Sequence, residues 1–260
     1  MESITDTSEL SIATGCFLGA LVGDALGAFL EFKRAITEVD VKEAFKMKGG
    51  GVHKLGPGQI TDDSEMAMSL AHGLVQGKRT LDLNAIASRY GLWFESMPFD
   101  IGGTTRNAVP KAVKMKEHQA EMMRKGAAKS IDSQSNGSLM RMTPICIWSR
   151  CLSPEDLEKA VIEEISLTHP NPGVQAICVC YALGIHYLFQ KPADYKGAYE
   201  TMKEYIKVKG EQAWLSIIEA QENDQLTDVK KASGWAIHAL ILGCIVFEEV
   251  LRIPKQWKKC

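Results

Sequence analysis

Apolar residues recur at intervals of three and four along most of the chain, which is the spacing of one buried face on an α-helix. No convincing strand-like alternation of apolar and polar residues interrupts this pattern. The sequence therefore predicts an all-α fold of roughly ten helices in one compact domain, with the ligand cleft at helix N-termini and loops. Beyond the first apolar segment, helical spacing covers residues 64–76, 82–95, 105–123, 154–166, 173–189, 195–207, 211–221 and 228–251.

The first long apolar segment, residues 12–32, has glycines at intervals of four. They are Gly15, Gly19, Gly23 and Gly27. Residues four apart share one side of a helix, so this row favours the close approach of a second helix. Asp24 argues against a membrane span, and we expect a buried central helix. Glu31, seven residues after Asp24, would share its helical face, so the two carboxylates either pair with buried donors or belong to a functional site.

Composition narrows the function class. The 30 basic and 32 acidic residues are well mixed and give a formal net charge of -2, so no basic surface for nucleic acid is expected. The seven cysteines lack metal-site spacing, and the polar, acidic start does not resemble a signal peptide. We expect a monomeric cytoplasmic protein without membrane partners. Its domain would cover residues 12–251, between an N-terminal tail at 1–11 and a C-terminal tail at 252–260.

Two adjacent carboxylates stand in the stretch GQITDDSEMAMSL, residues 58–70. Thr and Asp are favoured N-cap residues, and Asp62 with Glu65 has the spacing of a capping box. The same carboxylates are hard oxygen donors that suit magnesium or manganese. Helix capping and metal binding therefore both remain open for Asp62 and Asp63.

Two glycine-containing segments also lead into apolar stretches. They are FDIGGTTRNAV, residues 99–109, and SQSNGSLMRMTPI, residues 133–145. A helix that begins after such a turn presents backbone N–H groups and the positive end of its dipole, which can bind phosphate. A simple turn is the alternative for each. His169, which precedes a proline, either caps and packs or contacts a ligand.

Taken in order, six segments resemble the ADP-ribosylglycohydrolase family, which includes the dinitrogenase reductase-activating glycohydrolases and the ADP-ribosylarginine hydrolases. They are GALVGDALGAFLEF, GQITDDSEMA, DIGGTTRNA, SNGSLMRMTPI, THPNPGVQA and ASGWAIHALILG. The resemblance runs from about Ile12 to about Glu249. It implies an all-α domain that binds two divalent ions, usually magnesium or manganese, at the floor of a cleft for ADP-ribose.

The resemblance also implies roles for individual residues. Thr61, Asp62 and Asp63 match the metal-binding run. Glu31 and Asp100 match two carboxylates over the site, and either would transfer the proton during cleavage at the anomeric carbon. Asp24 would support a metal ligand without binding metal itself. The expected ligand-binding residues are Gly102, Thr104, Asn136, Gly137, Ser138 and His169.

One departure from the family is visible. Relatives complete the metal site with an Asp-x-Asp-Thr run after the last long helix, and no such run follows Ala232. The pairs Asp224/Asp228 and Glu248/Glu249 do not occupy the matching position. Three explanations remain open: the chain is a fragment or a truncated form, other groups and waters complete the site, or the protein binds without hydrolysis.

The leading functional hypothesis is a metal-dependent hydrolase that removes ADP-ribose from a protein side chain and so reverses mono-ADP-ribosylation. Arginine is the favoured linkage because DIGGTT resembles the nitrogenase-regulating branch, with serine or another O-linkage as the alternative. A catalytically weak or inactive ADP-ribose-binding module is the second hypothesis. The third is a helical structural protein in which the Thr-Asp-Asp run only caps its helix.

Overall fold

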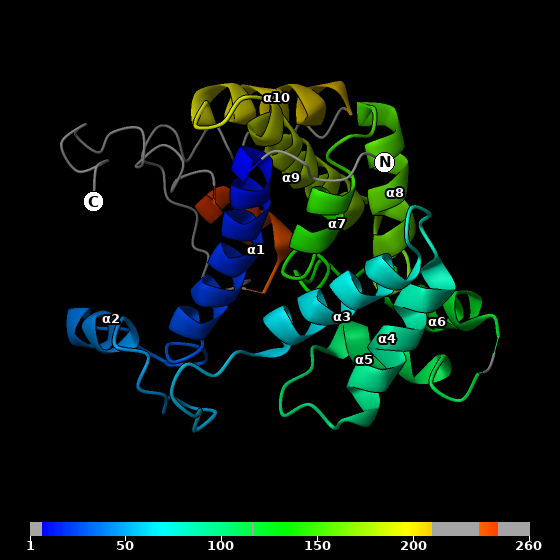
Figure 1. The fold of residues 1–260 in the computed structure, drawn as a ribbon. Coiled ribbons are helices and arrows are strands. Elements are labelled where there is room, and N and C mark those ends of the chain that lie inside the picture. Colours follow the sequence, from blue (N-terminus) through cyan, green and yellow to red (C-terminus); the bar gives the residue numbers. More distant parts are fainter. Residues whose placement is uncertain (1–6, 116, 210–233, 244–260) are drawn as a thin grey trace.

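A computed structural model of the chain describes residues 7–115, 117–209 and 234–243, which form helices and no β-strand (Figure 1). The all-α fold is confirmed. The helices are α1 (Thr7–Gly27), α2 (Glu38–Ala44), α3 (Asp62–Gln76), α4 (Leu83–Glu95), α5 (Gly103–Ala108), α6 (Gln119–Ala127), α7 (Thr143–Trp148), α8 (Pro154–Ile165), α9 (Pro172–Gln190) and α10 (Tyr195–Val208), with short 3₁₀ helices η1 (Val109–Lys111) and η2 (Ala128–Ser130).

Helical spacing located five of these helices to within two residues: α3, α4, α8, α9 and α10. Their starts are fixed by local chemistry. Asp82 accepts hydrogen bonds from the backbone N–H groups of Asn84 and Ala85 and so caps α4. Ser153 caps α8, whose first residue is a proline, and Asn171 caps α9 in the same way.

The single helix predicted over residues 105–123 is wrong. The segment forms α5, η1 and then α6, which begins only at residue 119. Pro110 lies in η1 and lacks the N–H that an α-helix needs at that position. His118 has a φ of 60°, which a continuous right-handed helix cannot include, so α6 begins only after this residue.

The prediction of a buried central helix over residues 12–32 is also wrong. The helix is α1, which starts at Thr7, ends at Gly27 and is largely exposed, with only 6% of its most apolar window buried. A methyl group at any of its four row-forming glycines would meet no described atom within 4 Å. The glycine spacing permits close packing, but α3 and α7, the described helices that pack most against α1, leave this row uncovered.

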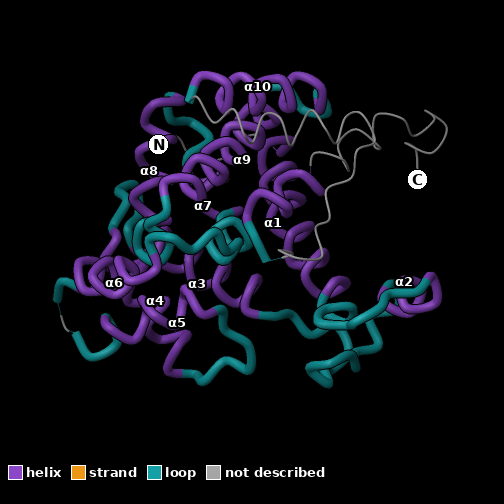
Figure 2. Tube along the Cα trace, turned by 180° about the vertical axis from the view of Figure 1, so that it is seen from behind, coloured by secondary structure: helices purple, strands orange, loops and turns teal. Residues whose placement is uncertain are grey.

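The core lies among α3, α4 and the bundle of α7 to α10. Gly73 of α3 lets α4 approach closely, because a methyl group there would lie 2.7 Å from Cα of Ile86. By length and composition α1 and α9 could each cross a membrane, and half of the α9 window is buried inside the protein. From both sides, α2 and the loops around it project away from this bundle (Figures 1 and 2).

Several predictions fall outside the described residues. These are the helix at 211–221, the parts of 228–251 on either side of residues 234–243, the acidic pairs Asp224/Asp228 and Glu248/Glu249, residues 1–6 of the N-terminal tail and the C-terminal tail. Residues 236–243 are helical, as expected for that stretch. The described chain thus contains every residue predicted to bind metal, transfer a proton or contact ADP-ribose.

Candidate metal centre and ligand cleft

The end of α1 is tied to the start of α3 by one carboxylate. Asp24 accepts hydrogen bonds from the backbone N–H of Thr61 at 2.9 Å and from its hydroxyl at 2.8 Å. It also accepts the backbone N–H of Ser64 at 3.2 Å. Asp24 therefore fixes Thr61 and stabilises the N-terminal turn of α3, while its expected support of a metal ligand stays a prediction.

Helix capping at α3 differs from the predicted capping box of Asp62 and Glu65. The N-cap is Thr61, whose hydroxyl oxygen accepts the backbone N–H of Asp63 at 3.4 Å. Glu65 instead accepts the indole N–H of Trp93 at 2.7 Å. Asp24 and Thr61, rather than Asp62 and Glu65, accept the backbone N–H groups at the start of α3. The carboxylates of Asp62 and Asp63 therefore remain available for another role.

These two carboxylates open onto a cavity of about 900 Å³. Its walls come from the turn after α1, the start of α3, the start of α5 and the loop before α7. The lining residues used below are Glu31, Lys33, Arg34, Asp62, Asp63, Asp100, Gly102, Gly103, Thr105, Ser135, Asn136, Gly137 and Met140. Seven residues predicted from sequence are among them: Glu31, Asp62, Asp63, Asp100, Gly102, Asn136 and Gly137. The fold thus brings together segments that are far apart in the chain.

Glu31 lies beyond the end of α1, so it does not share a helical face with Asp24 as predicted. It joins the same group of acids through the turn that follows. Burial, followed by the negative charges of Asp100, Asp62 and Asp24, raises the pKa of Glu31 to about 7. A glutamate with this pKa can both hold and release a proton near neutral pH.

The pKa values of the two aspartates at the start of α3 are raised for the same reasons. Burial and then the charges of Asp62, Asp24, Glu31 and Asp100 raise the pKa of Asp63 to about 8. Burial, Asp100 and Asp24 raise the pKa of Asp62 to about 6, although backbone N–H groups of Asp62 itself and Gly102 oppose the shift.

The donor set fits a hard divalent cation. Several partly buried carboxylates repel one another, and a divalent ion would offset that repulsion. Thr61 donates its hydroxyl proton to Asp24 and accepts the N–H of Asp63, which leaves one oxygen lone pair for a metal. Thr61, Asp62 and Asp63 together supply the oxygen ligands that magnesium and manganese prefer.

A buried ion pair supports the glycine loop on the opposite wall. The side chains of Arg141 and Glu164 have no exposed surface, and the guanidinium Nη2 lies 3.0 Å from Glu164 Oε1. The hydroxyl of Tyr90 donates to the same oxygen at 2.6 Å. Nη1 of Arg141 donates to the carbonyl oxygen of Gly137 at 3.1 Å, so this pair fixes the backbone of the loop.

Two hydroxyls, one of them held by the same arginine, set the tautomer of His169. Arg141 donates to the hydroxyl oxygen of Thr168 at 2.7 Å, and the Thr168 hydroxyl lies 2.8 Å from His169 Nδ1. Because Ser135 donates its hydroxyl proton to Thr104, it accepts from Nε2 of His169, so the ring proton resides on Nε2 and Thr168 donates to Nδ1. Nε2 then donates to the hydroxyl of Ser135 at 3.0 Å, and Ser135 donates to Thr104 at 3.1 Å.

His169 is therefore neutral and fixed. Burial, and then the charge of Arg141, lower the pKa of its imidazole well below the usual range. The loop is pinned from a second side, because the N–H of Asn136 donates to the carbonyl of Gly234 at 2.8 Å. Residues 135–137 thus form a rigid wall of the cavity.

Four predicted site residues lie behind the cavity surface. Thr61 is buried at the α3 start, and Thr104 hydrogen-bonds Ser133 and Ser135. His169 does not line the cavity and is linked to it by its hydrogen bond with Ser135, which does. Ser138 is 0% exposed and lies 3.5 Å from Sγ of Cys178. Their side chains support the wall, and their predicted contacts with metal or ligand remain predictions.

This arrangement can be compared with known proteins. A family model described as ADP-ribosylglycohydrolase matches residues 5–252. The chain belongs to the ADP-ribosylglycohydrolase family. A solved structure titled "ADP-ribosylglycohydrolase-related protein complex" superposes with a TM-score of 0.70 and 25% identity, over 92% of this chain and 76% of that one.

Relatives within the family carry informative names. ADP-ribosyl-[dinitrogen reductase] glycohydrolase of Rhodospirillum rubrum is 36% identical over 189 residues, which are 71% of this chain and 60% of the relative. The ADP-ribosylarginine hydrolase Tri1 of Serratia proteamaculans is 27% identical over 249 residues, 90% of this chain and 64% of the relative. The chain thus spans somewhat less than two thirds of the length of these relatives.

The structure adds cavity residues that sequence reasoning missed in this family member. Lys33 and Arg34 bring positive charge to the rim, and Ser135 and Met140 line the wall. Ser135 stands within a segment already singled out, and its place beside Asn136 was the available signal. Lys33 and Arg34 follow Glu31 directly, but nothing local distinguished them from other surface charges.

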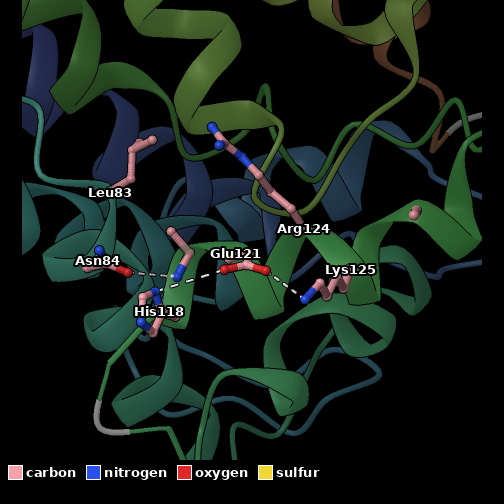
Figure 3. Close-up of a pocket in the computed structure, with 8 residues that line it drawn as sticks. Leu83, Asn84, His118, Glu121, Arg124 and Lys125 are labelled. Atoms are coloured by element: carbon pink, nitrogen blue, oxygen red, sulfur yellow. Dashed lines mark hydrogen bonds and ion pairs between the residues drawn. The ribbon is translucent and has the colours of Figure 1, made fainter.

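A second hollow, of about 560 Å³, lies between α4 and α6 (Figure 3). Its polar groups largely satisfy one another. Glu121 pairs with Lys125 at 2.6 Å and with His118 at 3.9 Å, and Asn84 accepts the backbone N–H of Ala120. It contains none of the family's matched residues, so the carboxylate-lined cavity is the candidate site.

Proposed function

We propose that this protein is a divalent-metal-dependent hydrolase that cleaves the bond between ADP-ribose and a modified arginine side chain. The observation that carries the proposal is the cavity of about 900 Å³, which has acids on one wall and a fixed glycine loop on another. Such a cavity matches a ligand that combines a sugar to be cleaved with a diphosphate to be held.

The metal would be held by Thr61, Asp62 and Asp63, in the Mg²⁺ or Mn²⁺ form usual for the family. When bound, the metal supplies positive charge that orients ribose hydroxyls and lowers the pKa of a water molecule. The raised pKa values of Asp62 and Asp63, about 6 and 8, support this assignment, because such carboxylates gain most from a cation.

Glu31 and Asp100 are the candidates for proton transfer. Glycosidic cleavage through an oxocarbenium-like state needs a base for water and an acid for the leaving group. Glu31, with a pKa of about 7, can change its protonation state at neutral pH, so we assign it the proton that moves. Burial, and then the charge of Asp100, keeps that pKa high.

The nucleotide would lie along residues 135–137 and the start of α5. The backbone of Asn136 and Gly137 is rigid, and neutral His169 adds no charge behind it. Gly102 and Gly103 present backbone at the N-terminus of α5, while Arg34, which also lines the cavity, can neutralise diphosphate oxygens. A rigid backbone and the guanidinium of Arg34 together suit a diphosphate, whereas Lys33 already pairs with Asp40 at 2.7 Å.

Arginine is the proposed linkage because relatives are named for that reaction. The Serratia and Pseudomonas Tri1 proteins are both called ADP-ribosylarginine hydrolases. The R. rubrum relative is named for ADP-ribosyl-dinitrogen reductase. The substrate would therefore be an ADP-ribosylated protein.

The test is release of ADP-ribose from an ADP-ribosylarginine peptide, with an ADP-ribosylserine peptide in parallel. We expect release from the arginine peptide with Mg²⁺ or Mn²⁺, and none after chelation. Asp62→Asn with Asp63→Asn should abolish release while α3 stays capped, because Thr61 and Asp24 form the cap. Full activity of the double variant would contradict the metal role. Tight ADP-ribose binding without release would favour the binding module.

A further inference from the structure

His53 lies between the two carboxylates of Glu31 and Asp100. Its Nε2 is 3.7 Å from Glu31 Oε2 and 3.5 Å from Asp100 Oδ2. One donor atom from each of the three residues lies within 4.8 Å of the other two. Sequence reasoning did not find this cluster, because its members come from three separate loops.

The His53 Nε2 atom is buried and has no hydrogen-bond partner in the described structure. A buried polar atom without a partner is costly, so this nitrogen is expected to have one in the working protein. Its distances to the carboxylates exceed the usual hydrogen-bond range of about 2.7–3.2 Å. Two ligand atoms on one tetrahedral ion, each at about 2.1 Å, are separated by about 3.4 Å. The distances from His53 Nε2 to the two carboxylates, 3.7 and 3.5 Å, are close to this value.

The imidazole ring is held in this orientation. Phe32 and Phe99 pack against it edge-on, with ring centroids at 5.3 and 5.4 Å. These phenylalanines adjoin Glu31 and Asp100 in sequence, so the residues that clamp the ring also carry the carboxylates. Gly51, with φ of 70°, lets the His53 loop approach the turn after α1, because a methyl group there would lie 2.7 Å from the Phe29 carbonyl oxygen.

We propose that Glu31, His53 and Asp100 form a binding site for one divalent transition-metal ion of the zinc type. One imidazole nitrogen and two carboxylate oxygens are a three-residue donor set of the kind that zinc and cobalt accept. Thr61, Asp62 and Asp63 offer only oxygen and suit magnesium or manganese. The chain thus presents two neighbouring sites with different metal preferences.

The site has a consequence for the proposed function, although its existence does not depend on hydrolysis. A zinc-type ion on Glu31 and Asp100 occupies the carboxylates assigned to proton transfer. It would therefore inhibit the reaction that magnesium or manganese supports. Low concentrations of zinc would inhibit hydrolysis, and removal of the His53 side chain would weaken this inhibition.

The test uses Co²⁺ alone as the probe, added to the full chain after chelation of other metals. Four-coordinate Co²⁺ with nitrogen and oxygen ligands absorbs in the visible range, and thiolate ligands add a near-ultraviolet band that would reveal binding to cysteine. We expect the visible bands to saturate at one Co²⁺ per chain, with no thiolate band. His53→Phe keeps an aromatic ring between Phe32 and Phe99 and should weaken Co²⁺ binding more than about tenfold.

Two further variants keep the test decisive. Glu31→Gln should weaken Co²⁺ binding as well, even if His53→Phe folds poorly. His72→Phe removes an exposed histidine of α3 and should leave the bands unchanged. Undiminished bands in both His53→Phe and Glu31→Gln, or no Co²⁺ binding, would overturn the proposal. Loss of the bands in Asp62→Asn/Asp63→Asn but not in His53→Phe would also overturn it. Magnesium-dependent hydrolysis without Co²⁺ binding would reject this site alone.

Discussion

Asp24 at the end of α1 accepts both the backbone N–H and the hydroxyl of Thr61, at 2.9 and 2.8 Å. The end of α1 therefore fixes the position of residues 61–63, which we propose bind metal. Asp24 would affect the proposed metal site through Thr61 and affects stability through the α3 N-terminus, and the two effects can be separated by mutation.

We expect Asp24→Ala to lower Mg²⁺ or Mn²⁺ affinity by about 10–100-fold, because it frees the Thr61 hydroxyl. It should also reduce the free energy of unfolding by about 1–3 kcal/mol, since buried N–H groups lose their acceptor. Asp82→Ala removes the α4 cap and is the matched control. It should lower the free energy of unfolding by about 0.5–2 kcal/mol and leave metal affinity unchanged. Calorimetric metal titration and urea unfolding measure both. Equal metal affinity in the two variants would contradict the role of Asp24.

The acids of the cavity predict an unusual pH dependence for the chelated protein. Unfolded Asp and Glu lose their protons near pKa values of 3.8 and 4.5, whereas folded Asp62, Glu31 and Asp63 keep theirs up to about 6, 7 and 8. Ionisation between these limits favours the unfolded state, so the free energy of unfolding should fall as pH rises from about 4 to about 8.

Thermal unfolding across this pH range, in chelator and in excess Mg²⁺, checks the expectation. The cation should remove most of the slope, because it stabilises the ionised carboxylates. Asp63→Asn should flatten the slope in chelator and raise stability at pH 8. A chelated wild-type protein whose stability rises over the same range would show that these acids are not destabilised by burial and one another.

The pairs Arg141–Glu164 and Arg124–Glu163 offer a direct comparison, because the two glutamates are neighbours on α8. The first pair has no exposed side-chain surface, and the second is on the surface. Arg141→Met should cost about 3–5 kcal/mol in unfolding free energy, since it leaves Glu164 buried and unpaired. Arg124→Met should cost less than about 1 kcal/mol. Denaturant unfolding distinguishes them, and equal losses would show that burial of the first pair is unimportant.

Gly137 leaves little room for a side chain. A methyl group there would lie 3.0 Å from the His169 ring, whereas one at Gly103 would meet nothing within 4 Å. Gly137→Ala should lower the free energy of unfolding by about 1–3 kcal/mol, and it should weaken ADP-ribose binding by displacing the loop. Gly103→Ala should change stability by less than about 0.5 kcal/mol. Unaltered stability and ADP-ribose affinity in Gly137→Ala would mean that the loop is less rigid than its contacts indicate.

Much of the fold could be predicted because local signals determine it. The apolar spacing of α3, α4, α8, α9 and α10 agrees with their caps, so pattern and boundary chemistry coincide. The exposure of α1 could not be predicted, since apolar residues and glycines make a helix suitable for packing without specifying a partner. The break around Pro110 has a local signal, which is the proline itself.

The candidate site divides in the same way. Glu31, Asp62, Asp63 and Asp100 could be named because each stands in a motif. His53 stands in none, and its meeting with Glu31 and Asp100 arises from loops that only the folded chain brings together. The capping role of Asp24 also depends on a long-range contact, which is why local reasoning assigned a capping box to Asp62 and Glu65.

The most direct test of the account is a calorimetric titration of the protein with Mg²⁺ or Mn²⁺, with and without ADP-ribose. We predict saturable metal binding that strengthens when ADP-ribose is present and disappears in Asp62→Asn/Asp63→Asn. ADP-ribose should in turn bind more tightly with metal than in chelator. Equal metal binding by the wild type and the double variant, or ADP-ribose binding that ignores metal, would contradict the assignment of this cavity as a metal-dependent ADP-ribose site.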